Sequence, residues 1–184
     1  EFCEQHPEVP VSFAEHATKS YAKVIHNIPM GAGVMRAIPV EKAIPVGTEQ
    51  VKSELLSTYI EANKAHIAIL PCQCRRVRRF MNEGAGDLEG GADLETGMCM
   101  FLGFAADMFI QNGKGKQITK DEAYEKLAYF EKIGCVHQIT TLQPGNAVAI
   151  CNCMPGTCLA RGATQYFNTP DASRSNYVAE DDKA

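Results

Sequence analysis

The sequence predicts an α+β fold, on three observations. Apolar residues recur at three- and four-residue spacing in segments 48–64 and 119–133, which is typical of helices with one buried face. Short apolar or alternating runs, typical of strands, occupy residues 66–70, 135–141 and 147–150. From residue 48 the elements follow the order helix, strand, helix, helix, strand, turn, strand. Because this is the element order of a winged helix, we expect a winged-helix-like core in which the first strand joins a β-hairpin.

Composition divides the chain into three parts. Residues 1–47 are expected to form an N-terminal helical arm, with a helix at 13–26 and proline-punctuated extended segments near its end. Residues 48–168 form the predicted main domain. Residues 169–184 are polar and are expected to form a frayed tail.

Local signals place the first elements of the main domain. Thr48 is suited to cap a helix that runs to about Lys64, and a buried strand follows at 66–70. Residues 75–98 contain four arginines and five glycines, and we expect a long loop there, between the cysteine-rich segment 72–74 and Cys99. Cys99 is then expected to begin a helix that continues to about Gln111.

The second half carries clearer signals. Thr119 and Glu122 form a capping box, which predicts a helix that ends at Gly134. An alternating segment follows, and a turn at 144–146 leads into residues 147–150. These residues are therefore expected to form the hairpin.

Charge and hydropathy argue against some classes of protein. The 184 residues carry a net charge of −4 and a pI near 5.7, which argues against nucleic-acid binding. No apolar run is long enough to span a bilayer. The first residues carry neither the basic region nor the apolar segment of a signal peptide, so we expect a cytoplasmic protein.

Cysteine is the informative residue type in this sequence. Six of the eight cysteines fall into two groups, and each group contains a Cys-x-Cys after an apolar run. Clustered cysteines without a secretory signal favour metal ligands over a disulfide framework. The candidate ligands are Cys72, Cys74, Cys99, Cys151, Cys153 and Cys158.

Two kinds of metal site suit such a ligand set. Thiolates hold iron–sulfur clusters, commonly four for each four-iron cube. One [4Fe-4S] cluster on four of the six cysteines is the simplest count, and the other two are left without an assigned role. Zinc held by four thiolates is the alternative, although Cys-x-Cys is not its usual ligand spacing.

The remaining candidates are interpreted more conservatively. Cys3 is expected to be an ordinary thiol and Cys135 a core residue, while His66 and His137 are not expected to bind metal. Arg75, beside Cys74, has two interpretations of equal weight. It either belongs to a solvated loop or contacts the cofactor, where it would offset the negative charge of a thiolate-ligated cluster.

Taken together, these segments resemble the 4Fe-4S ferredoxin or 4Fe-4S binding domain proteins of anaerobic bacteria and archaea. The resemblance covers roughly residues 38–160 and rests on Pro71-Cys72-x-Cys74-Arg75, Cys99 with Gly103 and Ala105-Ala106, Ile118-Thr119-Lys120-Asp121-Glu122-Ala123, Gly134-Cys135-Val136-His137 and Ile150-Cys151-Asn152-Cys153. It implies that the main domain binds a cluster and transfers electrons to or from a flavoprotein or iron–sulfur protein.

The leading expectation is an electron-transfer protein, or a subunit of a larger anaerobic oxidoreductase, and not a catalyst by itself. No acid–base pair stands out in the sequence. One alternative is a cluster-based redox-sensing regulator whose recognition helix is segment 119–133. That segment carries four acidic and three basic residues, which suits DNA phosphates poorly. The other alternative is a structural zinc-binding domain.

Overall fold

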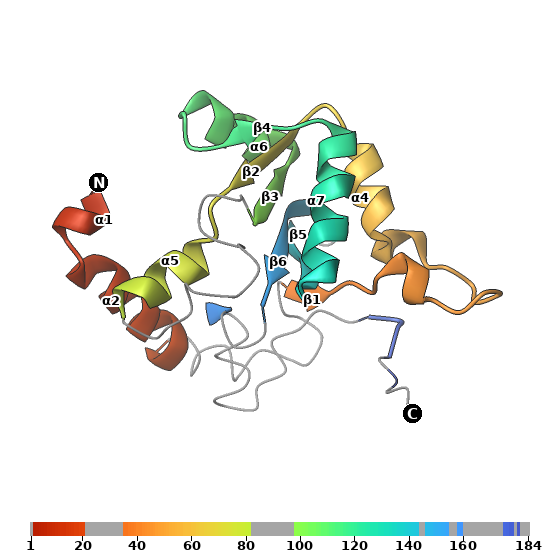
Figure 1. The fold of residues 1–184 in the computed structure, drawn as a ribbon, viewed down its shortest axis with the longest axis horizontal. Helices are drawn as coiled ribbons and strands as arrows, with labels where there is room; N and C mark the ends of the chain where they lie inside the picture. Colours follow the sequence, from red (N-terminus) through yellow and green to blue (C-terminus); the bar gives the residue numbers. More distant parts are fainter. Residues whose placement is uncertain are drawn as a thin grey trace.

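A six-stranded antiparallel sheet organises the molecule, in the strand order β1-β5-β6-β3-β2-β4 (Figure 1). The computed structural model describes residues 2–20, 35–81, 98–143, 146–154, 158–159, 175–178 and 180. The strands are β1 (Met35–Ala37), β2 (Ile67–Leu70), β3 (Cys99–Leu102), β4 (Lys116–Gln117), β5 (Val136–Gln143) and β6 (Asn146–Cys153).

Helices flank this sheet and form the N-terminal part of the chain. The α-helices are α1 (Phe2–Gln5), α2 (Glu8–Glu15), α4 (Leu56–Ala62), α5 (Gln73–Phe80), α6 (Gly103–Gln111) and α7 (Lys120–Lys132). A π-helical segment, η1 (His16–Ser20), follows α2. Two short 3₁₀ turns, η2 (Glu41–Ala43) and η3 (Lys52–Glu54), precede α4. Among the described residues, none of the helices has the length and apolar character needed to cross a membrane.

The two faces of the sheet bury different side chains, because successive strand residues point to opposite sides. Ile67, Met100 and Ile150 pack with Leu127 and Phe130 of α7 in the main core. Helix α4 contributes to the same core and lies beside α7 (Figure 1). On the opposite face, Ala68 and Leu70 of β2 pack against Ala106 of α6. We call these the α7 face and the α6 face.

Helix α7 confirms the capping-box prediction. The hydroxyl of Thr119 accepts the Glu122 backbone N–H at 3.2 Å, and the Glu122 carboxylate accepts the Thr119 N–H at 2.7 Å. Two of the helix's free N–H groups are thereby satisfied. The helix ends before Gly134, whose φ of +84° favours glycine. The α+β class and strand 66–70 are likewise confirmed.

Several predictions around β3 are wrong. Residues 73–80 form α5, so the predicted loop at 75–98 begins as a helix, and residues 82–97 lie outside the described part. Cys99 begins strand β3, and α6 begins only at Gly103. β3 pairs with β2 on one side and β6 on the other, so ladder hydrogen bonds on both sides outweigh the local helical pattern. It therefore separates β2 from the hairpin, and the expected winged-helix arrangement is not confirmed.

Other boundaries also shift. The helix predicted from Thr48 is reduced to η3 and α4, because Glu54 is held in a buried polar contact with residues 175–176. The predicted frayed tail is wrong for 175–178, since Tyr177 accepts the Val51 N–H at 2.9 Å. Helix α2 begins at Glu8, earlier than predicted, because Pro10 lies in the first turn, where a helix tolerates proline. The rest of the predicted helix 13–26 beyond Ser20, and turn residues 144–145, lie outside the described residues.

Candidate metal centre

Three chain segments bring the six candidate cysteines to one end of the sheet. Cys72 directly precedes α5, and Cys74 is that helix's second residue. Cys99 is the first residue of β3 and pairs with Cys151 of β6. Cys151 and Cys153 lie two residues apart on one strand, so they share a face. Ile150 and Asn152 point to the other face of the strand, and Ile150 packs in the main core on the α7 face. Cys151 and Cys153 therefore lie on the α6 face.

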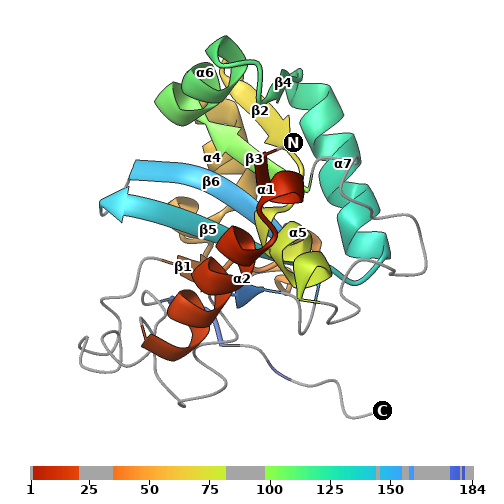
Figure 2. The same ribbon diagram turned by 90° about the vertical axis from the view of Figure 1, so that its left-hand side faces the viewer.

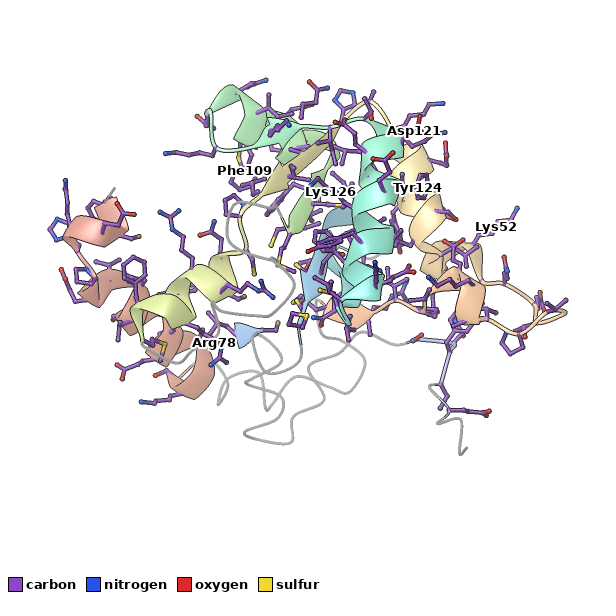
Figure 3. The ribbon with its side chains drawn as sticks, in the orientation of Figure 1. Lys52, Arg78, Phe109, Asp121, Tyr124 and Lys126 are labelled. Carbon is purple, nitrogen blue, oxygen red and sulfur yellow. The ribbon has the colours of Figure 1, made fainter. Side chains whose placement is uncertain are left out.

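The six thiols form a closed ring of side-chain contacts. Each sulfur contacts two others, and the contacts run in the order Cys72, Cys99, Cys151, Cys153, Cys158, Cys74 and back to Cys72. Sulfur atoms gather accordingly between α5 and β6 (Figure 3). We call this set of residues the thiol ring.

The chemistry of the ring is that of reduced thiols in pairwise contact. All eight cysteines are free, so no pair of ring sulfurs forms a disulfide. In the part of the chain that the structure describes, no three His, Cys, Asp or Glu side chains surround a single metal-ion position. The contacts therefore link neighbouring sulfurs around the ring.

Two ring sulfurs accept hydrogen bonds and are biased toward the thiolate. Hydrogen bonds from Cys74 and Cys99, together with the backbone N–H and charge of Arg75, outweigh burial and lower the pKa of Cys72 to about 3. Hydrogen bonds from Cys153 and Cys99, with one from Thr140, outweigh burial and hold the pKa of Cys151 well below its usual range. These hydrogen bonds thus favour the thiolate form of Cys72 and Cys151, which is the form that binds metals.

The other ring thiols act as donors. Hydrogen bonding to Cys158 and Cys72, followed by burial, raises the pKa of Cys74. Contacts with Cys151, together with burial, likewise raise the pKa of Cys99 and Cys153. Metal binding would replace these protons, because a ligating thiol is deprotonated.

Strand β5 adds two polar groups to the ring. Gln138 Nε2 lies 3.9 Å from the sulfur of Cys158, and Thr140 Oγ1 lies 3.8 Å from the sulfur of Cys151. The sequence analysis did not identify either residue. The alternation of segment 135–141 is the signal that places both on one face, but only pairing with β6 shows that the cysteines share that face.

Arg75 is buried beside the ring, which excludes the solvated-loop interpretation. Its side chain is 1% exposed, and its backbone N–H donates to the sulfur of Cys72. Nη1 and Nη2 have no hydrogen-bond partner among the described residues. Burial raises the pKa of the Cys135 thiol, and the charge of the Arg75 guanidinium opposes this rise.

The N-terminal arm covers one side of the ring. Helices α2 and α5 lie side by side (Figure 2), and Ala14, Val77 and Leu159 form a small core between them. Cys74 packs against this core, and Leu159 directly follows Cys158. The arm therefore shields the Cys74–Cys158 side of the ring from water.

Cys3, Cys135, His66 and His137 lie outside the ring. Cys3 lies in α1, and Cys135 packs in the main core with its sulfur 3.3 Å from Met154 Sδ, as expected of a core residue. His66 pairs with Asp107 at the surface. His137 is buried and lies 2.6 Å from Asn152 Oδ1, on the α7 face.

No protein-family model, curated protein or solved structure matches this chain. The chemistry of the thiol ring is therefore the basis on which its function is inferred.

Proposed function

We propose that the chain is an iron–sulfur electron-transfer protein, or an electron-transfer subunit of a larger oxidoreductase of an anaerobe. Four of the six ring cysteines (Cys72, Cys74, Cys99, Cys151, Cys153 and Cys158) would hold one [4Fe-4S] cluster. The observation that carries this proposal is the closed contact of six thiols from three separate chain segments.

The spacing of the ring cysteines along the chain favours an iron–sulfur cluster over zinc. A zinc ion takes four ligands arranged around one point. A four-iron cube spreads its thiolate ligands over several irons, so they lie around a larger group. Both groups of ring cysteines contain Cys-x-Cys, which is not the usual ligand spacing of a zinc site.

The residues around the ring suit one-electron chemistry. A bound cluster would supply the redox group, because iron–sulfur clusters exchange single electrons at potentials tuned by hydrogen bonds, burial and charge. Gln138 and Thr140 can donate to the sulfurs of Cys158 and Cys151, which stabilises the more negative, reduced state. The arm and the sheet keep water from most of the ring.

The proposal extends to partners and location. The chain would exchange electrons with a flavoprotein or an iron–sulfur protein in the cytoplasm, and it would bind no nucleic acid. The acidic net charge of −4 supports the last point, because phosphate binding requires basic residues.

Anaerobic purification followed by iron, sulfide and zinc analysis tests the proposal. We expect about four irons and four sulfides per chain for one cube, a brown sample, and an electron paramagnetic resonance signal after reduction. Serine variants of the six ring cysteines should lose iron at four positions and retain it at two. Cys3→Ser is the matched control, because Cys3 is a free, half-buried thiol of helix α1 outside the ring. A colourless protein with one zinc per chain would overturn the proposal.

A further inference from the structure

The buried guanidinium of Arg75 requires a negative partner. Arginine stays protonated in proteins, and a buried charge without a partner is costly. The side chain is 1% exposed, and neither Nη1 nor Nη2 has a hydrogen-bond partner within the described residues. A folded chain that retains such a charge is expected to have a use for it.

Carboxylates do not fill this role in the described part of the chain. The buried Glu54 is held by Ser175 and Asn176 and lies 3.5 Å from Arg36. Glu131 contacts Lys42 and lies 3.5 Å from His137 Nε2. Among the described residues, the charge of Arg75 acts on the thiols of Cys72 and Cys135.

The position of Arg75 directs its charge at the thiol ring. It is the third residue of α5, and its backbone N–H already donates to Cys72. Arg75 thus provides both a backbone donor and a full positive charge to the same side of the ring.

We propose that Arg75 is the counter-charge of a net-negative group bound by the thiol ring, so that its charge stabilises the loaded chain more than the unloaded chain. This inference rests on the proposed function, since thiolate-ligated iron–sulfur clusters carry net negative charge. Reduction adds one more negative charge to the loaded site. Arg75 therefore favours the reduced state and raises the reduction potential.

Unequal effects of one substitution in the unloaded and loaded chain test this proposal. Arg75→Met removes the charge and keeps much of the volume, and Arg75→Lys retains the charge. Arg76→Met is the matched control, because Arg76 is the next residue of α5 and is only half-buried. The full-length chain is studied as purified under anaerobic conditions, and again after chelation of its metal.

In the unloaded chain, Arg75→Met should shift the unfolding midpoint by at most about 2–6 °C, because Nη1 and Nη2 have no hydrogen-bond partner among the described residues and Arg75 acts on Cys72 through its charge and backbone N–H. In the loaded chain, the same variant should lose iron to a chelator several-fold faster. Its reduced-to-oxidised ratio at a given potential should fall about ten-fold, which corresponds to a decrease of about 59 mV in the reduction potential for one electron. Arg75→Lys should retain most of the potential, and Arg76→Met should change none of these quantities appreciably.

The possible failures are distinguishable. A wild-type chain that contains zinc, or takes up no iron and sulfide on reconstitution, overturns the proposed function itself. A wild-type chain that carries a cluster with the same potential and iron-loss rate as Arg75→Met overturns only the role of Arg75. Equal destabilisation of both states by Arg75→Met would also overturn it, because that result indicates packing and not charge. Where the unloaded chain does not unfold cooperatively, the potential and the iron-loss rate decide.

Discussion

Replacement of Glu54 by glutamine should destabilise the protein in a pH-dependent manner. The Glu54 side chain is 1% exposed and accepts hydrogen bonds from Ser175 Oγ at 2.5 Å, from the Asn176 N–H at 2.9 Å and from Asn176 Nδ2 at 2.6 Å. Arg36 Nη1 lies 3.5 Å away. Burial opposes the charged form, but these donors and the Arg36 charge outweigh it and lower the pKa of Glu54 below its ordinary value of 4.5.

The size of the effect follows from these contacts. A glutamine can keep the two Asn176 bonds as neutral ones and can exchange donor and acceptor roles with Ser175. The charge assistance of about three interactions is then lost, at about 1 kcal/mol each. We expect Glu54→Gln to lower the free energy of unfolding by about 2–3 kcal/mol at pH 7, which is about 4–12 °C in the unfolding midpoint.

The pH dependence gives the sharper test. A carboxyl whose pKa is lowered by folding stabilises the protein above its unfolded pKa, and this contribution is lost as the pH falls through the folded pKa. The difference between wild type and Glu54→Gln should therefore be complete above about pH 5 and shrink toward pH 3. Circular dichroism during urea or thermal unfolding, at one fixed metal-loading state, measures it.

A carboxyl in an exposed ion pair serves as the control. Glu61 lies 3.1 Å from Lys120 Nζ, and its side chain is 49% exposed. Glu61→Gln should cost at most about 1 kcal/mol, because water screens such pairs. The reasoning is refuted if Glu54→Gln costs no more than Glu61→Gln, or if its cost is the same at pH 7 and pH 3.

Three further predictions concern the sheet and α7. Asn152→Ala should lower the free energy of unfolding, measured in urea, by about 2–4 kcal/mol. It leaves the buried His137 Nδ1 and the Met98 carbonyl, each 2.6 Å from the asparagine, without partners. A decrease of less than about 1 kcal/mol would contradict this. Thr119→Ala should lower the free energy of unfolding by about 1 kcal/mol, because α7 loses its N-terminal cap. An unchanged unfolding midpoint would contradict this prediction. Gln138→Leu should lower the reduction potential, because it removes the amide beside Cys158; a redox titration that finds the same or a higher potential would exclude that role.

Local signals predicted the elements whose chemistry is contained in a short stretch. Thr119 and Glu122 lie three residues apart and satisfy each other's backbone groups, so α7 needs no distant partner to define its start. The apolar run at 66–70 is a strand in the structure for a similar reason, since it is short, β-branched and bounded by turn residues.

Non-local pairing overrode local pattern at β3. The segment after Cys99 has helical spacing, yet Cys99–Leu102 is a strand because β2 and β6 both pair with it. Gly103, with φ of +56°, then turns the chain into α6. No window of sequence around Cys99 contains the strands that decide this outcome, so it could not be predicted from that window.

The sequence by itself determined which residue types are available at the candidate site and that they come in two groups, because the clustering of six cysteines is visible in the chain. Only the tertiary structure decided that they form one closed ring, with Cys99 opposite Cys151 and Cys74 beside Cys158. The tertiary structure also decided that Arg75 is buried next to them, since residues 73–80 form a helix and not a loop. The physical reason is that sulfur contacts and burial depend on strand order and helix packing, which join segments far apart in the chain.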